Sequence, residues 1–257
     1  NGVNFISQHL TFSTIAGARK RDHPPSFDWR QPWWPEYKAL NEYQGRVSYL
    51  VSQGKAEHRI LLLHPTTTAF LEIAGPNHAS MLKGNIPKNP DMSEYIELIQ
   101  WLADRQYDFD FGEEFIMERH GKAEQSVLAV GEGNYSVVLI SGCMKNMKSS
   151  TVRLLQSFLQ NGGVVVSFKE KSFRIDAKVD EQAARLTEHP GWRHACDWSE
   201  LAQILNEFAQ ARVRFNGSHP LPSGFHHLRK NLGGGFALYF IANASLVPVK
   251  GKLKLTG

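Results

Sequence analysis

Short apolar runs and longer amphipathic stretches alternate through the middle of the chain. The apolar runs are four or five residues long, as expected for strands that are buried on both faces. They cover Ile60–Leu63, Val127–Val130, Val137–Ile140 and Val164–Phe168, and a further strand is predicted at 107–111. Elsewhere apolar residues recur every three or four positions, which predicts helices at 92–105, 113–119, 149–161 and 199–212. This alternation predicts a three-layer α/β domain of flavodoxin or class I glutamine-amidotransferase type, with a parallel sheet.

The segments on either side have a different pattern. Residues 3–12 are predicted to form a strand, followed by an irregular loop and then a helix that starts at Pro35-Glu36 and stops at Gln53-Gly54. One βα unit of this kind needs other strands beside it. Near the other end, 236–241 and 247–255 have no helical period and predict antiparallel strands. We therefore divide the chain into 1–58, a 59–215 α/β domain, and 216–257 as the start of an all-β domain.

Composition and charge narrow the class of protein. The chain has 257 residues, 42% of them hydrophobic and 21% charged, which is ordinary globular composition. No apolar run reaches the ~18 residues needed to span a bilayer, so no membrane partner is predicted. The net charge of +4 comes from residues 216–257, which hold five basic and no acidic residues. An excess this small offers little counterion release, so no nucleic-acid partner is predicted.

The ends of the chain lead to an expectation about its extent. It begins with Asn1, without an initiator Met, and both termini lie within strand-like patterns. We expect a segment of a longer protein. No charged and apolar leader precedes the first predicted strand, so the sequence carries no targeting signal that would assign a compartment.

The loop between the first strand and the first helix has the most unusual chemistry. Its run Arg19-Lys20-Arg21-Asp22 follows a strand that carries His9. Forked guanidinium donors and a carboxylate acceptor suit a polyhydroxylated or anionic ligand. Trp33 and Trp34 lie just beyond and could form platforms for a sugar ring. The alternative is a solvated basic loop with tryptophans packed under it.

This region resembles glycoside hydrolase family 106, the α-L-rhamnosidases. The residues that carry the resemblance are Gly2-Val3-Asn4-Phe5, His9, Gly17 to Asp22, Pro24-Pro25, Gln31 to Pro35, Tyr43, Arg46, Ser48, Tyr49, Gly54, Leu63-His64-Pro65, Tyr135, Gly162-Gly163 and Tyr239 to Asn243. The resemblance implies a (β/α)8 barrel whose last βα unit lies in residues 1–58, an accessory α/β domain, and the start of a β-sandwich. It implies removal of terminal α-L-rhamnose from glycans, and it favours an extracellular or periplasmic location.

The resemblance also implies which residues contact the carbohydrate substrate. They are His9, Arg19, Lys20 and Asp22, with Trp33 and Trp34 shaping the wall of the pocket or bracing the loop. Glycoside hydrolysis normally needs two carboxyl groups across the scissile bond. Only Asp22 is well placed among the acids of residues 1–58, so we expect the catalytic carboxylates upstream and no hydrolase activity from this segment alone. No cofactor is evident, and a divalent metal elsewhere in the full enzyme is left open.

Several other features of the sequence are candidates for chemistry. Asp108, Asp110, Glu113 and Glu114 could bind a metal, but acids at a helix start are favoured in any case. Cys143 follows a buried strand, as an amidotransferase nucleophile would, yet a buried inert thiol is commoner. His64 ends the first strand of the α/β domain and could either close a sugar pocket or bind at a domain junction. His219, His226 and His227 have no partner at metal-ligand spacing, and Gly131-Glu132-Gly133 is predicted to be a turn.

A rival hypothesis assigns the whole chain a non-catalytic role. The α/β domain resembles the trimerisation domains of some β-galactosidases, so its function could be to hold domains or subunits together. A homo-oligomer is therefore an alternative that the sequence leaves open.

Overall fold

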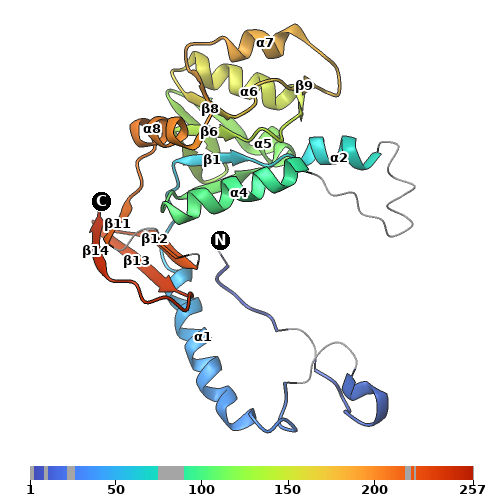
Figure 1. The fold of residues 1–257 in the computed structure, drawn as a ribbon, viewed down its shortest axis with the longest axis vertical. Coiled ribbons are helices and arrows are strands. Elements are labelled where there is room, and N and C mark those ends of the chain that lie inside the picture. Colours follow the sequence, from blue (N-terminus) through green and yellow to red (C-terminus); the bar gives the residue numbers. More distant parts are fainter. Residues whose placement is uncertain are drawn as a thin grey trace. The chain divides into compact units, whose positions relative to one another are not determined.

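The structure is a computed structural model that describes residues 3–8, 11–21, 27–74, 90–217, 221–222 and 224–256. The chain divides into two compact units, each built from separate segments (Figure 1). The smaller comprises residues 1–56 and 228–240, and the larger comprises 57–227 and 241–257. The predicted division at residues 58 and 215 stays a prediction. No helix among the described residues is long and apolar enough to cross a membrane.

A five-stranded parallel sheet forms the centre of the larger unit, as the alternating pattern predicts. Its strands are β1 (Ile60–Leu63), β2 (Phe109–Gly112), β6 (Val137–Ile140), β8 (Val164–Phe168) and β10 (Trp192–Ala195). Their order across the sheet is β2-β1-β6-β8-β10, and every neighbouring pair is parallel. Numbered along the chain, this order is 2-1-3-4-5. The order reverses between β1 and β6, which makes that gap the topological switch point of the sheet.

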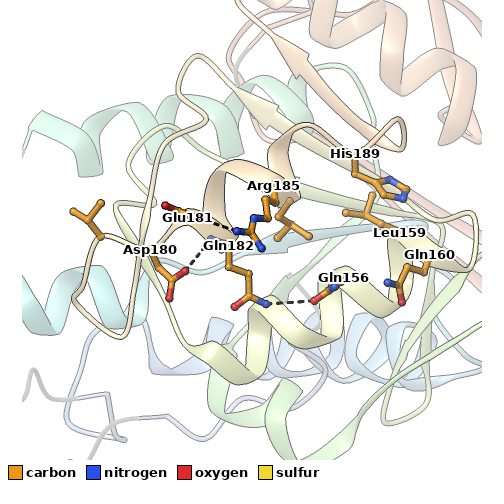
Figure 2. Close-up of a pocket in the computed structure, with 10 residues that line it drawn as sticks. Gln156, Leu159, Gln160, Asp180, Glu181, Gln182, Arg185 and His189 are labelled. Atoms are coloured by element: carbon orange, nitrogen blue, oxygen red, sulfur yellow. Dashed lines mark hydrogen bonds and ion pairs between the residues drawn. The ribbon is translucent and has the colours of Figure 1, made fainter.

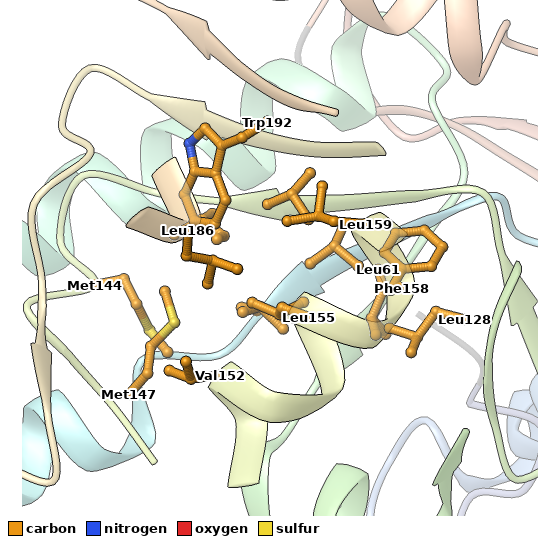
Figure 3. Close-up of a cluster of buried hydrophobic side chains, with 14 of the residues drawn as sticks. Leu61, Leu128, Met144, Met147, Val152, Leu155, Phe158, Leu159, Leu186 and Trp192 are labelled. Carbon is orange, nitrogen blue, oxygen red and sulfur yellow. The ribbon is translucent and has the colours of Figure 1, made fainter. Parts of the chain in front are cut away.

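Both faces of the sheet are buried, which explains the continuously apolar strands. Along β1, Leu61 and Leu63 belong to one core cluster, whereas Ile60 and Leu62 belong to the other. The first cluster packs under α5 (Glu114–His120), α6 (Ser149–Gln160) and α7 (Glu181–Thr187) (Figure 3). The second packs under α4 (Pro90–Asp104) and α8 (Trp198–Phe208). Because adjacent strand residues point to opposite faces, a polar residue at any β1 position would enter a core.

Acidic side chains start three of these helices. Glu113 accepts a hydrogen bond from Ile116 N, and Asp180 accepts one from Gln182 N. Asp197 accepts two, from Ser199 N and Glu200 N. Each satisfies backbone donors that have no partner within the first helical turn. The helix predicted to run to residue 212 ends at Phe208, because the chain turns there toward the next strand.

One predicted strand lies in a different sheet from the one expected. The run β4 (Val127–Val130) pairs antiparallel with β3 (Gly121–Glu124) and β5 (Gly133–Tyr135), and is not part of the parallel sheet. The predicted turn at Gly131-Glu132-Gly133 joins β4 to β5, and Gly131 has the left-handed backbone (φ +57°) that a tight turn favours. A two-residue turn returns the chain antiparallel, which excludes β4 from the parallel sheet.

Three short elements lie at the carboxyl end of the central sheet. Helix α2 (Thr66–Ala74) follows β1, and the two-residue strands β7 (Asn146–Met147) and β9 (Arg174–Ile175) pair in parallel. None of these elements was predicted from the sequence. For β7 and β9 the reason is that a two-residue strand has no measurable period.

The two strands predicted at 236–241 and 247–255 do not pair with each other. Strand β13 (Phe236–Asn243) pairs with β12 (Phe225–Gly233), and β14 (Gly251–Leu255) pairs antiparallel with β11 (Val213–Gly217). The two predicted strands are therefore antiparallel members of two different sheets. In β11, Val213 is fully buried and Phe215 is nearly so. The last strand thus completes a ladder that begins directly after α8.

The smaller unit holds α1 (Tyr37–Ser52) and the short 3-10 helices η1 (Gly17–Arg21) and η2 (Trp34–Glu36). Helix α1 stops where expected, and Gly54 has a left-handed backbone (φ +65°). The strand predicted at 3–12 is wrong for residues 3–8 and 11–12, which form no strand. A strand needs a hydrogen-bonded neighbour, and no described strand pairs with these residues; Phe5 is 80% exposed.

Candidate functional site

The predicted sugar-binding loop is described only in part. Arg19 lies in η1 and is exposed to solvent. The backbone of Lys20 also lies in η1, but its side chain falls outside the described part of the chain. His9 and Asp22 lie outside the described residues altogether. The structure therefore neither assembles nor separates these four side chains, and their role in binding stays a prediction.

The two predicted tryptophans meet at one aromatic ring. Trp34 stacks on Tyr37 with ring centroids 5.2 Å apart and planes 16° from parallel, and Trp33 contacts the same ring at 5.8 Å. Trp34 and Tyr37 line a shallow groove of about 540 Å³ with Pro35, Lys38, Asn41 and Glu42. Trp34 stays 39% exposed. An indole face beside amide and carboxylate groups suits a sugar ring, whose C–H face packs on aromatics while its hydroxyls bind polar groups.

A hydrogen-bonded carboxylate ties the two sides of this loop together. Asp28 accepts from the Thr11 hydroxyl (3.0 Å), from Arg30 N (3.0 Å) and from Arg30 Nε (2.9 Å). The hydrogen bond with Asp28 raises the pKa of the Arg30 guanidinium. Asp28 therefore organises the loop, in keeping with its exclusion from the predicted sugar contacts.

In the larger unit, a polar network occupies the carboxyl end of the sheet at the switch point. The hydroxyl of Thr68 accepts from Lys145 N and Asn146 N, both at 3.1 Å, and the side chain is 4% exposed. Asn146 Nδ2 donates to the Thr67 hydroxyl (3.0 Å), and its Oδ1 accepts from Ala177 N (2.7 Å). These bonds join α2 after β1 to the segment after β6. They lie at the end of the sheet where open parallel sheets usually bind ligands.

A fully buried carboxylate completes the network. Glu114, 0% exposed, accepts from the Thr67 hydroxyl at 2.5 Å and from Lys148 N at 2.7 Å. A buried carboxylate without donors would be very costly, so these two bonds are needed to keep it there. Sequence analysis treated Glu114 as a helix-start acid or a metal ligand and missed this role. The run Thr66-Thr67-Thr68 directly after β1 was the signal that could have indicated a polar network.

The other acidic residues of the candidate metal cluster have separate partners. Asp108 lies 2.9 Å from His227 Nε2, and Asp110 lies 2.9 Å from His58 Nδ1 and accepts from the Tyr135 hydroxyl. Glu113 caps α5. Within the described ranges, no three His, Cys, Asp or Glu side chains come together in a way that could hold a metal ion.

His64 takes part in contacts within the α/β domain. Its Nδ1 lies 2.9 Å from the Thr66 hydroxyl, and its ring meets Tyr95 and Phe111 edge-on. The ring is therefore held just after β1 by Thr66, the first residue of α2, and by two aromatic neighbours.

Cys143 lies in a hydrophobic core. It is 1% exposed, and its Sγ lies 2.8 Å from the Ser141 hydroxyl. Burial, and to a smaller extent the Cys143 thiol, raise the pKa of the neighbouring Tyr95 hydroxyl. Apolar burial disfavours the thiolate that a nucleophile requires. This environment is typical of an inert thiol.

Two grooves open on the surface of the larger unit. The first, of about 620 Å³, lies between α6 and α7 (Figure 2). Its polar side chains already stabilise α7: Asp180 caps it, Arg185 pairs with Glu181 at 3.0 Å, and Gln182 donates to Gln156. The groove is therefore explained by helix packing.

The second groove, of about 590 Å³, lies at the carboxyl end of the sheet. Its lining combines α2, the segment after β6 and the loop after β8, through Thr68, Leu71, Glu72, Lys145, Ser172, Phe173, Arg174 and Val179. The sequence did not indicate that Lys145 and Arg174 line one groove, because residues 29 positions apart are brought together only by the fold.

The loop beside the second groove has a fixed conformation. The Glu170 carboxylate accepts from Ser172 N, Lys171 N and the Ser172 hydroxyl. These bonds, with a smaller contribution from the charge of Lys145, lower the pKa of Glu170 to about 2. The Glu170 carboxylate is thus ionised, and its hydrogen bonds go to the next two residues of its own turn.

Comparison with solved structures shows a distant likeness to a rhamnosidase. No protein-family model matches the chain, and no curated protein matches it. A rhamnosidase from Novosphingobium sp. PP1Y has a similar structure, with a TM-score of 0.57 and 13% sequence identity. The match covers 86% of this chain and 20% of the rhamnosidase, so the chain spans about a fifth of that protein's length. The likeness is one of fold.

Proposed function

We propose that the chain is a segment of a glycoside hydrolase that removes terminal α-L-rhamnose, or a related sugar, from glycans or glycosides. The observation that carries the proposal is the likeness of fold to a rhamnosidase over 86% of the chain. It agrees with the resemblance that the sequence shows to glycoside hydrolase family 106. Because the matched rhamnosidase is about five times longer than the matched region, we assign the catalytic carboxylates to another part of the enzyme.

The proposal includes a finer assignment of the fold. Residues 1–58 would be the last βα unit of a (β/α)8 barrel, 59–215 an amidotransferase-like domain, and 216–257 the start of a β-sandwich. The strand order 2-1-3-4-5 supports the flavodoxin-like assignment, since that order is typical of such sheets. The resemblance favours an enzyme that works outside the cytoplasm.

In this proposal the residues 9–34 form one wall of the sugar site. His9, Arg19, Lys20 and Asp22 contact sugar hydroxyls, and Trp33 and Trp34 provide the aromatic wall. The exposed Trp34 face beside Asn41 and Glu42 supports this role, because it combines an apolar platform with hydrogen-bonding groups.

The test compares single substitutions in the full-length enzyme, assayed on an aryl α-L-rhamnoside. Arg19→Ala and Asp22→Ala each remove hydrogen bonds to the sugar, and we expect kcat/KM to fall roughly tenfold or more. Lys122→Ala is the control, because this exposed side chain lies on β3 and does not line the groove at Trp34. Unchanged kinetics in both variants would remove the loop from the site. The isolated 257-residue chain should not hydrolyse the substrate, and robust turnover would contradict the assignment of the carboxylates.

The alternative that we propose for the α/β domain is a structural or oligomerisation role, like that of the trimerisation domains of β-galactosidases. The hydrogen bonds of Thr67, Thr68 and Asn146 tie the segments after β1 and β6 together, which supports a rigid domain that holds other parts in place. Light scattering tests it: a stable oligomer supports the role in assembly, whereas a monomer at micromolar concentration argues against it.

A further inference from the structure

Two cationic side chains line the second groove of the larger unit, and the charge of one of them, Lys145, also acts on the Glu170 carboxylate. Lys145 and Arg174 are both exposed. Within the described parts of the chain, no hydrogen bond or ion pair engages the Lys145 amine or the Arg174 guanidinium. Some other cations of this unit have partners: the exposed Arg185 pairs with Glu181, and the half-buried Arg214 donates to Asn206.

The backbone holds these two residues at fixed neighbouring positions. Arg174 N donates to Lys145 O at 2.8 Å, and the β7–β9 ladder aligns Asn146 with Arg174. Lys145 N donates a hydrogen bond to the buried Thr68 hydroxyl. Side chains that start from such a fixed backbone lose less conformational entropy when they bind a ligand. The backbones that carry the two cations are therefore fixed side by side, although each flexible side chain must still be ordered when a ligand binds.

The rest of the lining suits a sugar ring better than a simple anion. Leu71 and the half-buried Phe173 provide apolar surface, and Phe173 is held by stacking on Trp192 at 6.1 Å. The Ser172 hydroxyl, which donates to Glu170, can still accept a hydrogen bond from a sugar hydroxyl. Glu170, the nearest other carboxylate on this loop, is occupied by its own turn and does not pair with Arg174.

We propose that this groove binds an acidic sugar of the hexuronate class, with the carboxylate on Lys145 and Arg174 and the ring on Phe173 and Leu71. Arg174 can bind a carboxylate with two parallel hydrogen bonds, and Lys145 adds a point charge. The ligand class rests on the proposed function, since a glycoside hydrolase meets glycans. The groove would be a glycan-binding subsite separate from the loop at residues 9–34.

The test is calorimetric titration of the 257-residue chain with sodium D-glucuronate. We expect binding that weakens in 0.5 M NaCl, because salt screens exposed charges. D-glucose, which has the ring without the carboxylate, and sodium sulfate, which has charge without the ring, should each bind at least tenfold more weakly. Arg174→Ala and Lys145→Ala should each raise Kd roughly tenfold or more. Arg153→Ala and Lys122→Ala are the matched controls, since both residues are exposed on other elements of the same unit.

Three outcomes would overturn the proposal: no glucuronate binding, binding that the two groove variants leave unchanged, or equal binding of sulfate. Circular dichroism of each variant checks that the fold is retained. The proposed function is tested separately, because an aryl rhamnoside carries no acid. Rhamnosidase activity is assayed in the full-length enzyme, because the 257-residue chain is expected to be inactive. Glucuronate binding by the chain together with an inactive full-length protein would sustain the groove and reject the proposed enzyme. An active full-length enzyme whose chain does not bind glucuronate would reject the groove alone.

Discussion

At the residue scale, the Thr68 hydroxyl has the largest structural role in the switch-point network. Thr68→Val keeps the shape but leaves Lys145 N and Asn146 N without their acceptor. We expect the free energy of unfolding to fall by about 2–4 kcal/mol, because each buried donor without a partner costs about 1–3 kcal/mol. Urea unfolding followed by circular dichroism measures it.

A matched control is available in the same unit. Thr151 is also buried, at 1% exposed, but its hydroxyl has no hydrogen-bond partner among the residues that the structure describes. Thr151→Val should therefore leave stability within about 1 kcal/mol or raise it. Equal effects of the two substitutions would show that the Thr68 hydrogen bonds contribute nothing.

The Glu170 turn predicts a specific pH dependence. Backbone donors lower the folded-state pKa of Glu170 from 4.5 to about 2, so its contribution to stability is complete above about pH 4.5 and is lost as the pH falls toward 2. The difference in unfolding free energy between the wild type and Glu170→Gln should thus be larger at pH 6 than at pH 3. Because this carboxylate is largely exposed, the difference will be small. A difference that is constant with pH would contradict the lowered pKa.

At the scale of the element, a glycine within α1 and a glycine just after its end have opposite expected behaviour. A Cβ at Gly54 would lie 2.4 Å from Asn231 O, and its φ of +65° already disfavours other residues. Gly54→Ala should therefore lower the melting temperature. Gly45 lies within the helix, and a Cβ there meets nothing within 4 Å, so Gly45→Ala should stabilise α1 by roughly 0.5–1 kcal/mol. Differential scanning calorimetry of both variants tests the pair, and an equal loss in both would refute the argument.

The elements that sequence reasoning predicted well are those with a strong period or composition. Ile60–Leu63, Val137–Ile140 and Val164–Phe168 have the predicted bounds, because burial on both faces leaves no polar position. The strand β10 was missed, since Arg193 and His194 interrupt its apolar residues. The pairing of β4 was missed because periodicity says nothing about which neighbour a strand takes. Lys145 and Arg174 meet only through the fold.

At the scale of the whole molecule, the last strand is part of the larger unit. Leu253 lies opposite Phe215 in the ladder between β14 and β11, at the edge of the α/β core. Removal of residues 249–257 would leave the buried Val213 and Phe215 without that ladder. We expect the melting temperature to fall by several degrees, as for a loss of about 1–3 kcal/mol in a domain of this size. Lys252→Ala, an exposed position in the same strand, should change it by less than about 1 °C. A truncated chain that melts like the wild type would show that β14 is dispensable.

Both compact units are assembled from segments that are far apart in the chain, and this has a consequence for synthesis on the ribosome. The local α/β core between β1 and α8 can form as soon as those residues emerge, but residues 1–56 must wait for 228–240. Contacts of such long sequence separation close slowly, so residues 1–56 would lack residues 228–240 while the larger unit between them is synthesised. The exposed tryptophans and tyrosines of residues 1–56 would stay accessible to a nascent-chain chaperone during that time.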